Sequence, residues 1–322
     1  MFRKKNILYK VEGSKKKGMG HVFRSYFLIK ILKKKNNIII FTEKKSESET
    51  FFKKKGFKII SYLKTDELKI LKKIILTSKI DKFINDYILI KKKIYFYLIK
   101  HNLDAYFLDT KRIKARKKIY CINTFISSNQ KHENYYEGLK YVIVDPNLNI
   151  KNKKNLSKKL NVVLHFGGTD EKKLNLKIVN YLSNYKKLFV LKIILGPALK
   201  YNKKKIYDLE KNIKLKCKIY DYPKKLNPIY ENSDIAVISG GNTLFNFCFL
   251  GKKNISISTT ELERGSCKKM EKLNSTKYLG HYNKITKNKF LKLFNKVINS
   301  KIKNQKFSKI NGLNEISKII NS

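Results

Sequence analysis

The sequence predicts an α/β fold in which two similar halves each hold a parallel sheet. Two observations predict it. Short β-rich runs alternate with amphipathic segments along the chain, and three glycine-bearing turns each follow a predicted strand and precede a predicted helix. The chain has 322 residues, enough for two domains of ordinary size, and 42% of them are hydrophobic, which suffices for buried cores.

The first half of the chain alternates strands with helices. Strands are predicted over residues 6–11, 37–42, 57–62, 81–86, 104–109, 117–122 and 141–145. A helix is predicted over 21–35, where Val22, Tyr26, Ile29 and Lys33 share one face. Another is predicted over 65–79, with Thr65 as its N-cap.

A lysine- and asparagine-rich stretch, 146–159, interrupts this alternation, which then restarts. The second half holds strands at 161–166, 188–195, 214–220, 234–239 and 254–258, a helix at 171–185, and a polar helical tail from Asn283. We therefore place an N-terminal domain at 1–148, a linker at 149–160 and a C-terminal domain at 161–322. The tail is expected to pack back on the N-terminal domain.

The net charge of +50 invites a nucleic-acid or membrane hypothesis, but its make-up argues against a specific nucleic-acid partner. Only five of the 74 basic residues are arginine, the residue that nucleic-acid readers favour for bidentate contacts. The lysines are spread along the whole chain and form no single basic arm. We attribute the charge to compositional bias and expect weak adhesion to polyanions at low salt.

The four cysteines lie far apart and form no C-x-x-C pair, so neither a zinc site nor a disulfide framework is expected. The basic start of the chain lacks the apolar run of a signal peptide, and no stretch approaches about 18 uninterrupted apolar residues. We expect a cytoplasmic protein without a transmembrane segment. The oligomeric state is left open.

The three glycine turns are the strongest functional signal. They contain Gly18 and Gly20, then Gly167, Gly168 and Thr169, and finally Ser239, Gly240, Gly241, Asn242 and Thr243. Turns at the carboxyl ends of parallel strands bind ligands in open α/β folds, and the start of the following helix favours an anion. We therefore expect a phosphorylated ligand in the cleft between the two domains. The spacing matches neither the dinucleotide nor the P-loop motif, so neither NAD nor P-loop ATP is expected.

Polar residues near the first turn supply candidate chemistry. His21 opens a predicted helix, whose positive end favours the neutral ring, so it serves either as a general base or as a structural hydrogen-bonding group. Arg24, one turn further on, could hold a phosphate or carboxylate, or be a solvated cation. Asp86 and Tyr87 end a strand, where the carboxylate either binds sugar hydroxyls or caps a helix. Asp170 is expected to cap a helix.

The remaining histidines, His101, His132, His165 and His281, are expected to be core or surface residues, because none has carboxylates at metal-ligand spacing. No metal is expected.

Four segments together resemble one family. They are KVEGSKKKGMGHVFRS (10–25), YYEGLKYVIVDP (135–146), VVLHFGGTDEKKL (162–174) and SDIAVISGGNTLFNFCFLGK (233–252). Their order and spacing resemble the UDP-2,4-diacetamido-2,4,6-trideoxy-β-L-altropyranose hydrolases of pseudaminic acid biosynthesis. They are also similar to the spore coat polysaccharide biosynthesis protein G-like proteins, of the MurG-like GT-B superfamily.

This resemblance implies a GT-B fold, with two Rossmann-like domains whose parallel sheets face an interdomain cleft that holds a UDP-sugar. The diphosphate would lie mainly against the C-terminal turn at 239–243. His21 would be the base that activates water, which attacks the anomeric carbon and displaces UDP without a metal or other cofactor.

The chain departs from the family pattern at three places. Asn246 stands where the superfamily usually has a glutamate that contacts the ribose. Glu261 and Glu263 stand near a loop that usually carries proline and glutamine, and Glu263 is a candidate contact to the nucleotide. Lys10 and Glu12 replace the arginine and aspartate of the opening motif.

The sequence therefore supports a metal-independent UDP-acetamido-sugar hydrolase in nonulosonic-acid or surface-polysaccharide biosynthesis as the main hypothesis. A GT-B glycosyltransferase that passes the sugar to a hydroxyl acceptor is the alternative. A non-catalytic nucleotide-sugar binder and a nucleic-acid-binding protein are further hypotheses.

Overall fold

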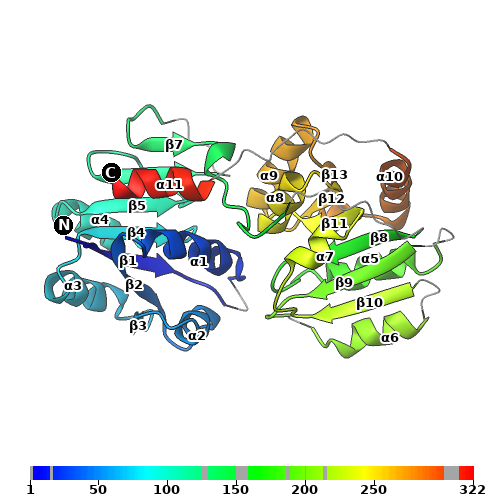
Figure 1. Cartoon of the computed structure of the whole chain (residues 1–322), viewed down its shortest axis with the longest axis horizontal. Helices are drawn as coiled ribbons and strands as arrows, with labels where there is room; N and C mark the ends of the chain where they lie inside the picture. Colours follow the sequence, from blue (N-terminus) through cyan, green and yellow to red (C-terminus); the bar gives the residue numbers. More distant parts are fainter. Residues whose placement is uncertain are drawn as a thin grey trace. The chain divides into compact units, whose positions relative to one another are not determined.

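The computed structural model describes residues 3–14, 17–124, 130–149, 159–185, 189–199, 201–212, 216–300 and 312–322. The chain forms two compact units, coloured in sequence order in Figure 1. The N-terminal unit is Met1–Ile143 with Ile310–Ser322, and the C-terminal unit is Val144–Lys309. Most of the predicted linker at 149–160 lies outside the described residues.

The described part of the N-terminal unit contains a seven-stranded parallel sheet in the order β3-β2-β1-β4-β5-β6-β7. Its strands are β1 (Lys5–Val11), β2 (Asn36–Glu43), β3 (Ile59–Tyr62), β4 (Lys82–Asp86), β5 (Asp104–Leu108), β6 (Ile119–Asn123) and β7 (Tyr135–Glu137). In the register of β1 and β4, Val11 lies beside Asp86. The end of β4 therefore adjoins the glycine turn that follows β1.

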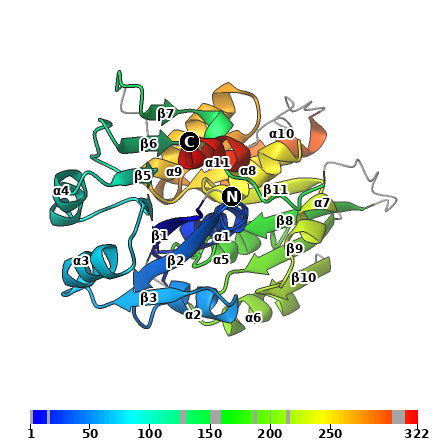
Figure 2. The same cartoon turned by 60° about the vertical axis from the view of Figure 1, so that its left-hand side comes forward.

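Helices cover both faces of this sheet (Figure 2). They are α1 (Gly20–Leu32), α2 (Glu47–Lys54), α3 (Glu67–Thr77), α4 (Lys92–Lys100) and α11 (Gly312–Asn321), with a 3-10 turn η1 at Leu139–Tyr141. Helices α1, α2 and α11 pack with one apolar cluster and α3 and α4 with another. Burying each large apolar side chain contributes about 1.5–3 kcal/mol, so the two clusters hold the helices on the sheet.

Helix α11 comes from the far end of the chain and completes the N-terminal unit. Lys82 is 1% exposed, and its ammonium donates a hydrogen bond to the carbonyl of Ile320 in the last turn of α11. At its first residue, a Cβ added to Gly312 would lie 2.2 Å from the carbonyl oxygen of Val142. The two contacts fix both ends of α11, and glycine is required where its backbone meets residue 142.

The described part of the C-terminal unit contains a six-stranded parallel sheet in the order β10-β9-β8-β11-β12-β13. Its strands are β8 (Leu160–His165), β9 (Phe189–Leu195), β10 (Lys216–Asp221), β11 (Ile235–Ser239), β12 (Lys253–Ser258) and β13 (Lys277–His281). Its helices are α5 (Leu174–Leu182), α6 (Lys204–Asn212), α7 (Asn227–Glu231), α8 (Asn242–Phe249), α9 (Glu261–Lys272) and α10 (Lys287–Asn299), with a 3-10 turn η2 at Tyr282–Lys284.

The predicted strands are confirmed within a few residues, with one exception. The strand predicted at 141–145 is wrong, because Leu139–Tyr141 forms η1 and the chain then runs outside the sheet. The apolar residues Val142 and Ile143 are buried, which explains the error: their hydrophobicity serves packing beside α11 and not a strand. The short strand β7 and the strand β13 were not predicted from the sequence.

Two details of the predicted helices are also wrong. Helix α3 begins at Glu67 after Asp66, so Thr65 is not its N-cap. Val22 and Ile29 of α1 are buried as expected, whereas Tyr26 is half-buried and Lys33 is exposed beyond the helix end. The other buried residues of α1 are Arg24, Ser25, Leu28 and Leu32.

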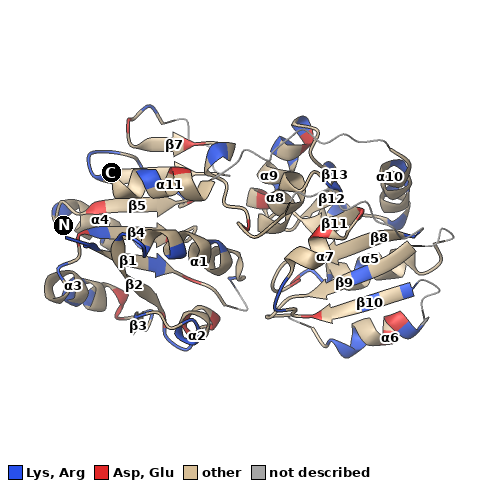
Figure 3. Ribbon diagram, in the orientation of Figure 1, with Lys and Arg blue, Asp and Glu red and all other residues tan. Residues whose placement is uncertain are grey.

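The basic residues lie on helices and strands of both units (Figure 3). Among the described residues, no helix is long and apolar enough to cross a membrane.

Candidate functional site

His21 lies in the first turn of α1 and faces the end of β4. Its Nδ1 atom is 3.2 Å from Oδ1 of Asp86, and its side chain is 23% exposed. A carboxylate can only accept a hydrogen bond, so Nδ1 carries a proton, and in the neutral form of the ring Nε2 presents its lone pair. No hydrogen bond from another described residue to Nε2 is found. A ring held in this way can accept a proton at Nε2.

Asp86 is fully buried and is surrounded by donors. Its Oδ2 accepts hydrogen bonds from the hydroxyls of Tyr9 (3.0 Å) and Ser25 (2.6 Å), and its Oδ1 accepts from Nε of Arg24 (2.8 Å). Burial alone would raise the pKa of Asp86, but Arg24 and His21 outweigh it and hold the pKa well below 3.8. The carboxylate is therefore ionised, and it orients the imidazole.

These contacts correct both hypotheses for Asp86. Its carboxylate does not cap a helix, and with no exposed surface it is not open to sugar hydroxyls. The burial of Asp86 could not be predicted, because an aspartate at a strand end followed by a tyrosine looks the same in sequence whether it faces solvent or a helix.

Arg24 is likewise fully engaged and is neither a solvated cation nor open to a phosphate. Its guanidinium bridges Asp86 and Asp109, with Nη1 donating to Oδ2 of Asp109 at 2.6 Å. Burial would lower the pKa of Arg24, but the two carboxylates raise it above its usual value. Asp109 also accepts from the amide (2.6 Å) and hydroxyl (2.7 Å) of Thr124. A continuous chain of polar contacts thus links β4, β5 and β6 behind His21.

The glycine turn before α1 has the geometry that its sequence suggests. Gly18 adopts a left-handed conformation (φ 77°) and donates its amide to the Ser14 carbonyl at 2.8 Å, which closes the turn, and Gly20 begins the helix. Tyr87 lies edge-on to the His21 ring, with the ring centroids 5.5 Å apart, and the Lys17 ammonium lies 5.5 Å from the Tyr87 ring centre.

The two replaced residues of the opening motif form a buried ion pair at the same edge of the sheet. The Lys10 ammonium lies 2.8 Å from Glu12 and 3.2 Å from Glu67, and the Tyr62 hydroxyl donates to Glu12 at 2.7 Å. Burial would raise the pKa of Glu12, but Lys10 and Lys17 lower it to about 2. Each of these buried charges therefore lies beside an opposite charge of the same unit.

In the C-terminal unit, the other two glycine turns follow the neighbouring strands β8 and β11. Gly167 is left-handed (φ 78°), and a Cβ added to it would lie 3.9 Å from the Ser239 hydroxyl. Gly168 and Thr169 continue this turn, and the Gly168 carbonyl accepts from the Ala198 amide at 2.9 Å after β9. The predicted residues of both turns therefore lie close together at one edge of this sheet.

The second of these turns leads into α8, whose first residues are Asn242 and Thr243 after Gly241. A Cβ on Gly240 would lie 2.5 Å from Cys267 Sγ and 2.8 Å from the Glu263 carbonyl, so only glycine fits against α9. The start of α8 directs backbone N–H groups outward, which suits an anion.

Two polar side chains expected to contact the nucleotide already have partners. Asn246 Oδ1 accepts the Asp145 amide at 3.1 Å. Glu263 Oε2 accepts the amide (2.7 Å) and hydroxyl (2.6 Å) of Thr259, and burial raises its pKa. Its Oε1 lies 3.4 Å from where a Cβ on Gly241 would be, so this carboxylate is beside the turn.

Asp170 and His165 flank the first C-terminal turn. The Asp170 carboxylate accepts the amides of Leu174 (2.7 Å) and Asn175 (3.0 Å) at the start of α5, so the predicted capping role is confirmed. Burial raises the pKa of Asp170 to about 6 and lowers that of His165 to about 4. His165 is 7% exposed, which confirms that it is a core residue.

The structure thus brings His21, Arg24, Asp86 and Tyr87 together in one unit, and the turns at 167–169 and 239–243 with Asn246 and Glu263 in the other. Four residues that form the chain of polar contacts behind His21 were not predicted from the sequence: Tyr9, Ser25, Asp109 and Thr124. Of these four residues, only Asp109 could have been proposed from the sequence, because it ends a predicted strand.

Comparisons with known proteins bear on the fold. No protein-family model matches the chain. The uncharacterized protein MJ1062 of Methanocaldococcus jannaschii is 27% identical over 272 residues. The match covers 79% of this chain but 55% of that protein, so the chain spans about half the length of this relative.

Solved glycosyltransferase structures are similar over nearly the whole chain. MurG of Acinetobacter baumannii has a TM-score of 0.71 at 12% identity, covering 98% of this chain and 99% of that one. A glycosyltransferase of Rickettsia africae has a TM-score of 0.66 at 12% identity and full coverage (100%) of both chains. Anabaena Alr3699/HepE has a TM-score of 0.59 at 10% identity, covering 97% and 94%.

These similarities confirm the GT-B fold that the resemblance implied. The hydrolase family named by that resemblance is not confirmed.

Proposed function

We propose that this chain is a glycosyltransferase that moves a sugar from a nucleoside diphosphate sugar to a hydroxyl acceptor. The observation that carries the proposal is the pairing of His21 with the buried Asp86 at the carboxyl edge of a GT-B sheet. The similar solved structures support the transferase over the hydrolase, because they are described as glycosyltransferases, and the Anabaena structure contains UDP and glucose.

In the proposed reaction the His21 Nε2 atom removes the proton from the acceptor hydroxyl as its oxygen attacks the anomeric carbon. The bond between that carbon and the diphosphate oxygen breaks, and the nucleoside diphosphate leaves with the electron pair. Asp86 keeps the ring in the tautomer that accepts at Nε2 and stabilises the imidazolium that forms. This division of roles needs no movement of a proton from Asp86.

The C-terminal unit is assigned to the nucleotide. The start of α8 and the glycine turns at 167–168 and 240–241 supply backbone N–H groups and close backbone approach, both suited to a diphosphate. Asn246 and Glu263 lie beside this turn and are the candidates for contact with the nucleoside.

The test is the release of UDP from UDP-N-acetylhexosamines by the purified chain, with and without hydroxyl acceptors. His21→Asn should lower the rate at least 100-fold, since general-base catalysis contributes 10²–10⁴-fold. His101→Asn, at an exposed histidine of the same unit, is the matched control and should keep the activity. Unchanged turnover in His21→Asn would refute the assignment of the base.

The same assay separates the transferase from the alternatives. A rate that depends on the acceptor, with a glycosylated product, supports transfer. Equal release of UDP with water as sole acceptor would instead support the acetamido-sugar hydrolase of nonulosonic-acid or surface-polysaccharide biosynthesis. Binding of UDP by calorimetry with no turnover of any sugar nucleotide would support a non-catalytic binder.

A further inference from the structure

The chain of polar contacts behind His21 ends in a carboxylate that does not touch the imidazole, that of Asp109. Asp109 is 4% exposed and follows β5, whereas His21 lies on α1. Arg24 and Asp86 lie between the two, so Asp109 acts on the ring through them. The proposed transfer gives Asp109 no role of its own.

One oxygen of Asp86 is shared between the imidazole and the guanidinium. Oδ1 accepts a hydrogen bond from Nε of Arg24 at 2.8 Å and another from its Nη2, and it lies 3.2 Å from Nδ1 of His21. The other oxygen, Oδ2, accepts the hydroxyls of Tyr9 and Ser25. Arg24 and His21 therefore compete for the negative charge of the same atom.

Asp109 binds the guanidinium nitrogen that Asp86 does not contact. Nη1 of Arg24 donates to Oδ2 of Asp109 at 2.6 Å, so two carboxylates share one guanidinium. All three groups are buried, and the interaction between buried charges is screened only weakly. Asp109 therefore offsets part of the positive charge that Arg24 brings to Asp86.

The carboxylate of Asp109 is fixed by groups other than Arg24. It accepts the amide of Thr124 at 2.6 Å and the hydroxyl of Thr124 at 2.7 Å, at the end of β6. The backbone of Asp109 is left-handed (φ 48°), a conformation that is uncommon in residues other than glycine and that clusters at functional sites. This carboxylate is thus held in one place beside the guanidinium.

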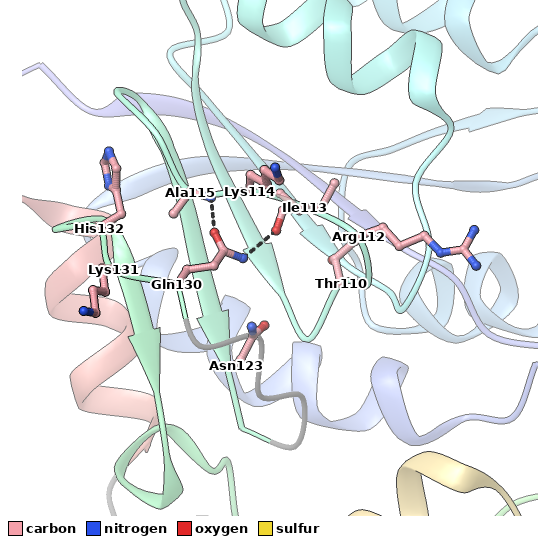
Figure 4. A pocket seen from close by; sticks show the side chains of 9 residues that line it. All are labelled: Thr110, Arg112, Ile113, Lys114, Ala115, Asn123, Gln130, Lys131 and His132. Carbon is pink, nitrogen blue, oxygen red and sulfur yellow. Dashed lines mark hydrogen bonds between the residues drawn. The ribbon is translucent and has the colours of Figure 1, made fainter.

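The segment after β5 is also tied to the neighbouring strand. Thr110 lines a cavity of about 550 Å³, shown in Figure 4, and space of this kind beside a strand end would let the end move. The Thr110 hydroxyl donates to the Tyr87 carbonyl and accepts from the Asn85 amide, both at 2.8 Å. These two hydrogen bonds hold the residue that follows Asp109 against the end of β4.

We propose that Asp109 is a positioning residue that sets how readily His21 accepts a proton. By binding Nη1 of Arg24, it leaves more of the negative charge of Asp86 to the imidazole. That charge stabilises the imidazolium and keeps the proton of the neutral ring on Nδ1. The consequence for turnover rests on the proposed function, whereas the effect on the ring does not.

The other titratable groups near the ring belong to neighbouring elements. Tyr87, after β4, lies edge-on to the ring, and the Lys17 ammonium lies 5.5 Å from the Tyr87 ring centre. Lys17 is paired with Glu12 and, at 2.7 Å, with Glu43. These groups are the same in a variant at Asp109, so a change in proton uptake can be assigned to the lost carboxylate.

The test is a pH titration of the purified full chain by proton–nitrogen NMR of the histidine rings, without any substrate. The signal that disappears in His21→Asn identifies the ring. In the unaltered chain its neutral form should carry the proton on Nδ1, and a proton on Nε2 would overturn the proposal. Asp109→Asn should lower the midpoint of proton uptake by at least about 0.5 pH unit and increase the share of the Nε2–H tautomer.

Further variants separate the charge from the fold. Asp109→Ser removes the same charge and leaves room for water, so it should lower the midpoint even where Asp109→Asn does not fold. Asp104→Asn removes a carboxylate from the other end of β5, and Phe107→Leu makes a core defect in the same strand. Both controls should stay within about 0.2 pH unit of the unaltered chain. A smaller shift than this in a folded Asp109 variant, or an equal shift in a control, would refute the proposal.

The NMR samples contain no nucleotide, so failure of this inference and failure of the proposed function are distinct. In a chain that turns over UDP-N-acetylhexosamines, the acid limb of the plot of kcat against pH should move in Asp109→Asn as far as the NMR midpoint does. A lowered midpoint without turnover would refute the transferase and support the role of Asp109. An unmoved midpoint with turnover intact would refute the role of Asp109 alone.

Discussion

The chain of polar contacts behind His21 allows the sharpest test of the structure. Arg24 is 6% exposed and lies between Asp86 (0%) and Asp109 (4%), so its guanidinium neutralises two carboxylates that have almost no contact with water. Arg24→Met keeps an unbranched apolar stem but removes the guanidinium and its charge. Two buried carboxylates then remain without a cation.

The expected loss is large. Removing one partner of a buried ion pair destabilises a protein by about 3–5 kcal/mol. For a unit of this size, 1 kcal/mol lowers the melting temperature by about 2–4 °C, so the N-terminal unit should melt about 6–20 °C lower near pH 7.5.

The loss should also depend on pH with a defined sign. In the unaltered chain the pKa of Asp86 is lowered, so its contribution is present above pH 3.8 and is lost as the pH falls through the folded pKa. Without Arg24, burial raises the pKa of this carboxyl, so its protonation on acidification relieves the uncompensated charge. The destabilisation of Arg24→Met should therefore shrink as the pH falls.

Scanning calorimetry of Arg24→Met at pH 7.5 and 4.5 measures both effects. The exposed Lys34→Met, just beyond the end of α1, is the matched loss of one positive charge and should change stability by less than about 0.5 kcal/mol. A loss below about 1 kcal/mol at pH 7.5, or one that grows on acidification, would refute this account of the buried charges.

Two further predictions concern the C-terminal unit. Because the pKa of Asp170 is raised in the folded state, its contribution to the free energy of unfolding falls as the pH rises from 4 to 6. Because the pKa of His165 is lowered, its contribution falls in the opposite direction, as the pH drops from 6.5 to 4. Urea titrations should therefore show stability rising with pH in Asp170→Asn and falling in His165→Gln, each by up to about 3 kcal/mol, and parallel curves would contradict both. Gly240→Ala should destabilise by about 1–3 kcal/mol, because its Cβ would clash with Cys267 of α9. Gly265→Ala, on α9 itself, meets nothing within 4 Å and should stabilise slightly, so equal effects of the two substitutions in thermal melts would contradict the close approach at Gly240.

Much of the fold is visible in the sequence because parallel strands are continuous apolar runs. Strands such as β1 and β8 carry four or more apolar residues between polar turns, and the alternation with helices then predicts the parallel sheets. The strand predicted at 141–145 failed because hydrophobicity reports burial and does not distinguish a strand from chain packed beside a helix.

The candidate site was predicted only in part. His21 and the glycine turns were found because their residue types are rare in this chain and follow strands. The partnership of His21, Arg24 and Asp86 could not be predicted, because it depends on β4 lying beside β1, although more than 60 residues separate Asp86 from the other two.

The docking of α11 on the N-terminal unit has a consequence for how the protein is made. Residues 310–322 belong to a unit whose other residues end at 143, and the entire C-terminal unit is translated between them. At about 5–20 residues per second, synthesis of the remaining 179 residues takes roughly 9–36 s, and the N-terminal unit lacks its last helix for that time. During that interval the apolar surface that Leu313, Ile316 and Ile320 later cover is open to chaperones and to aggregation.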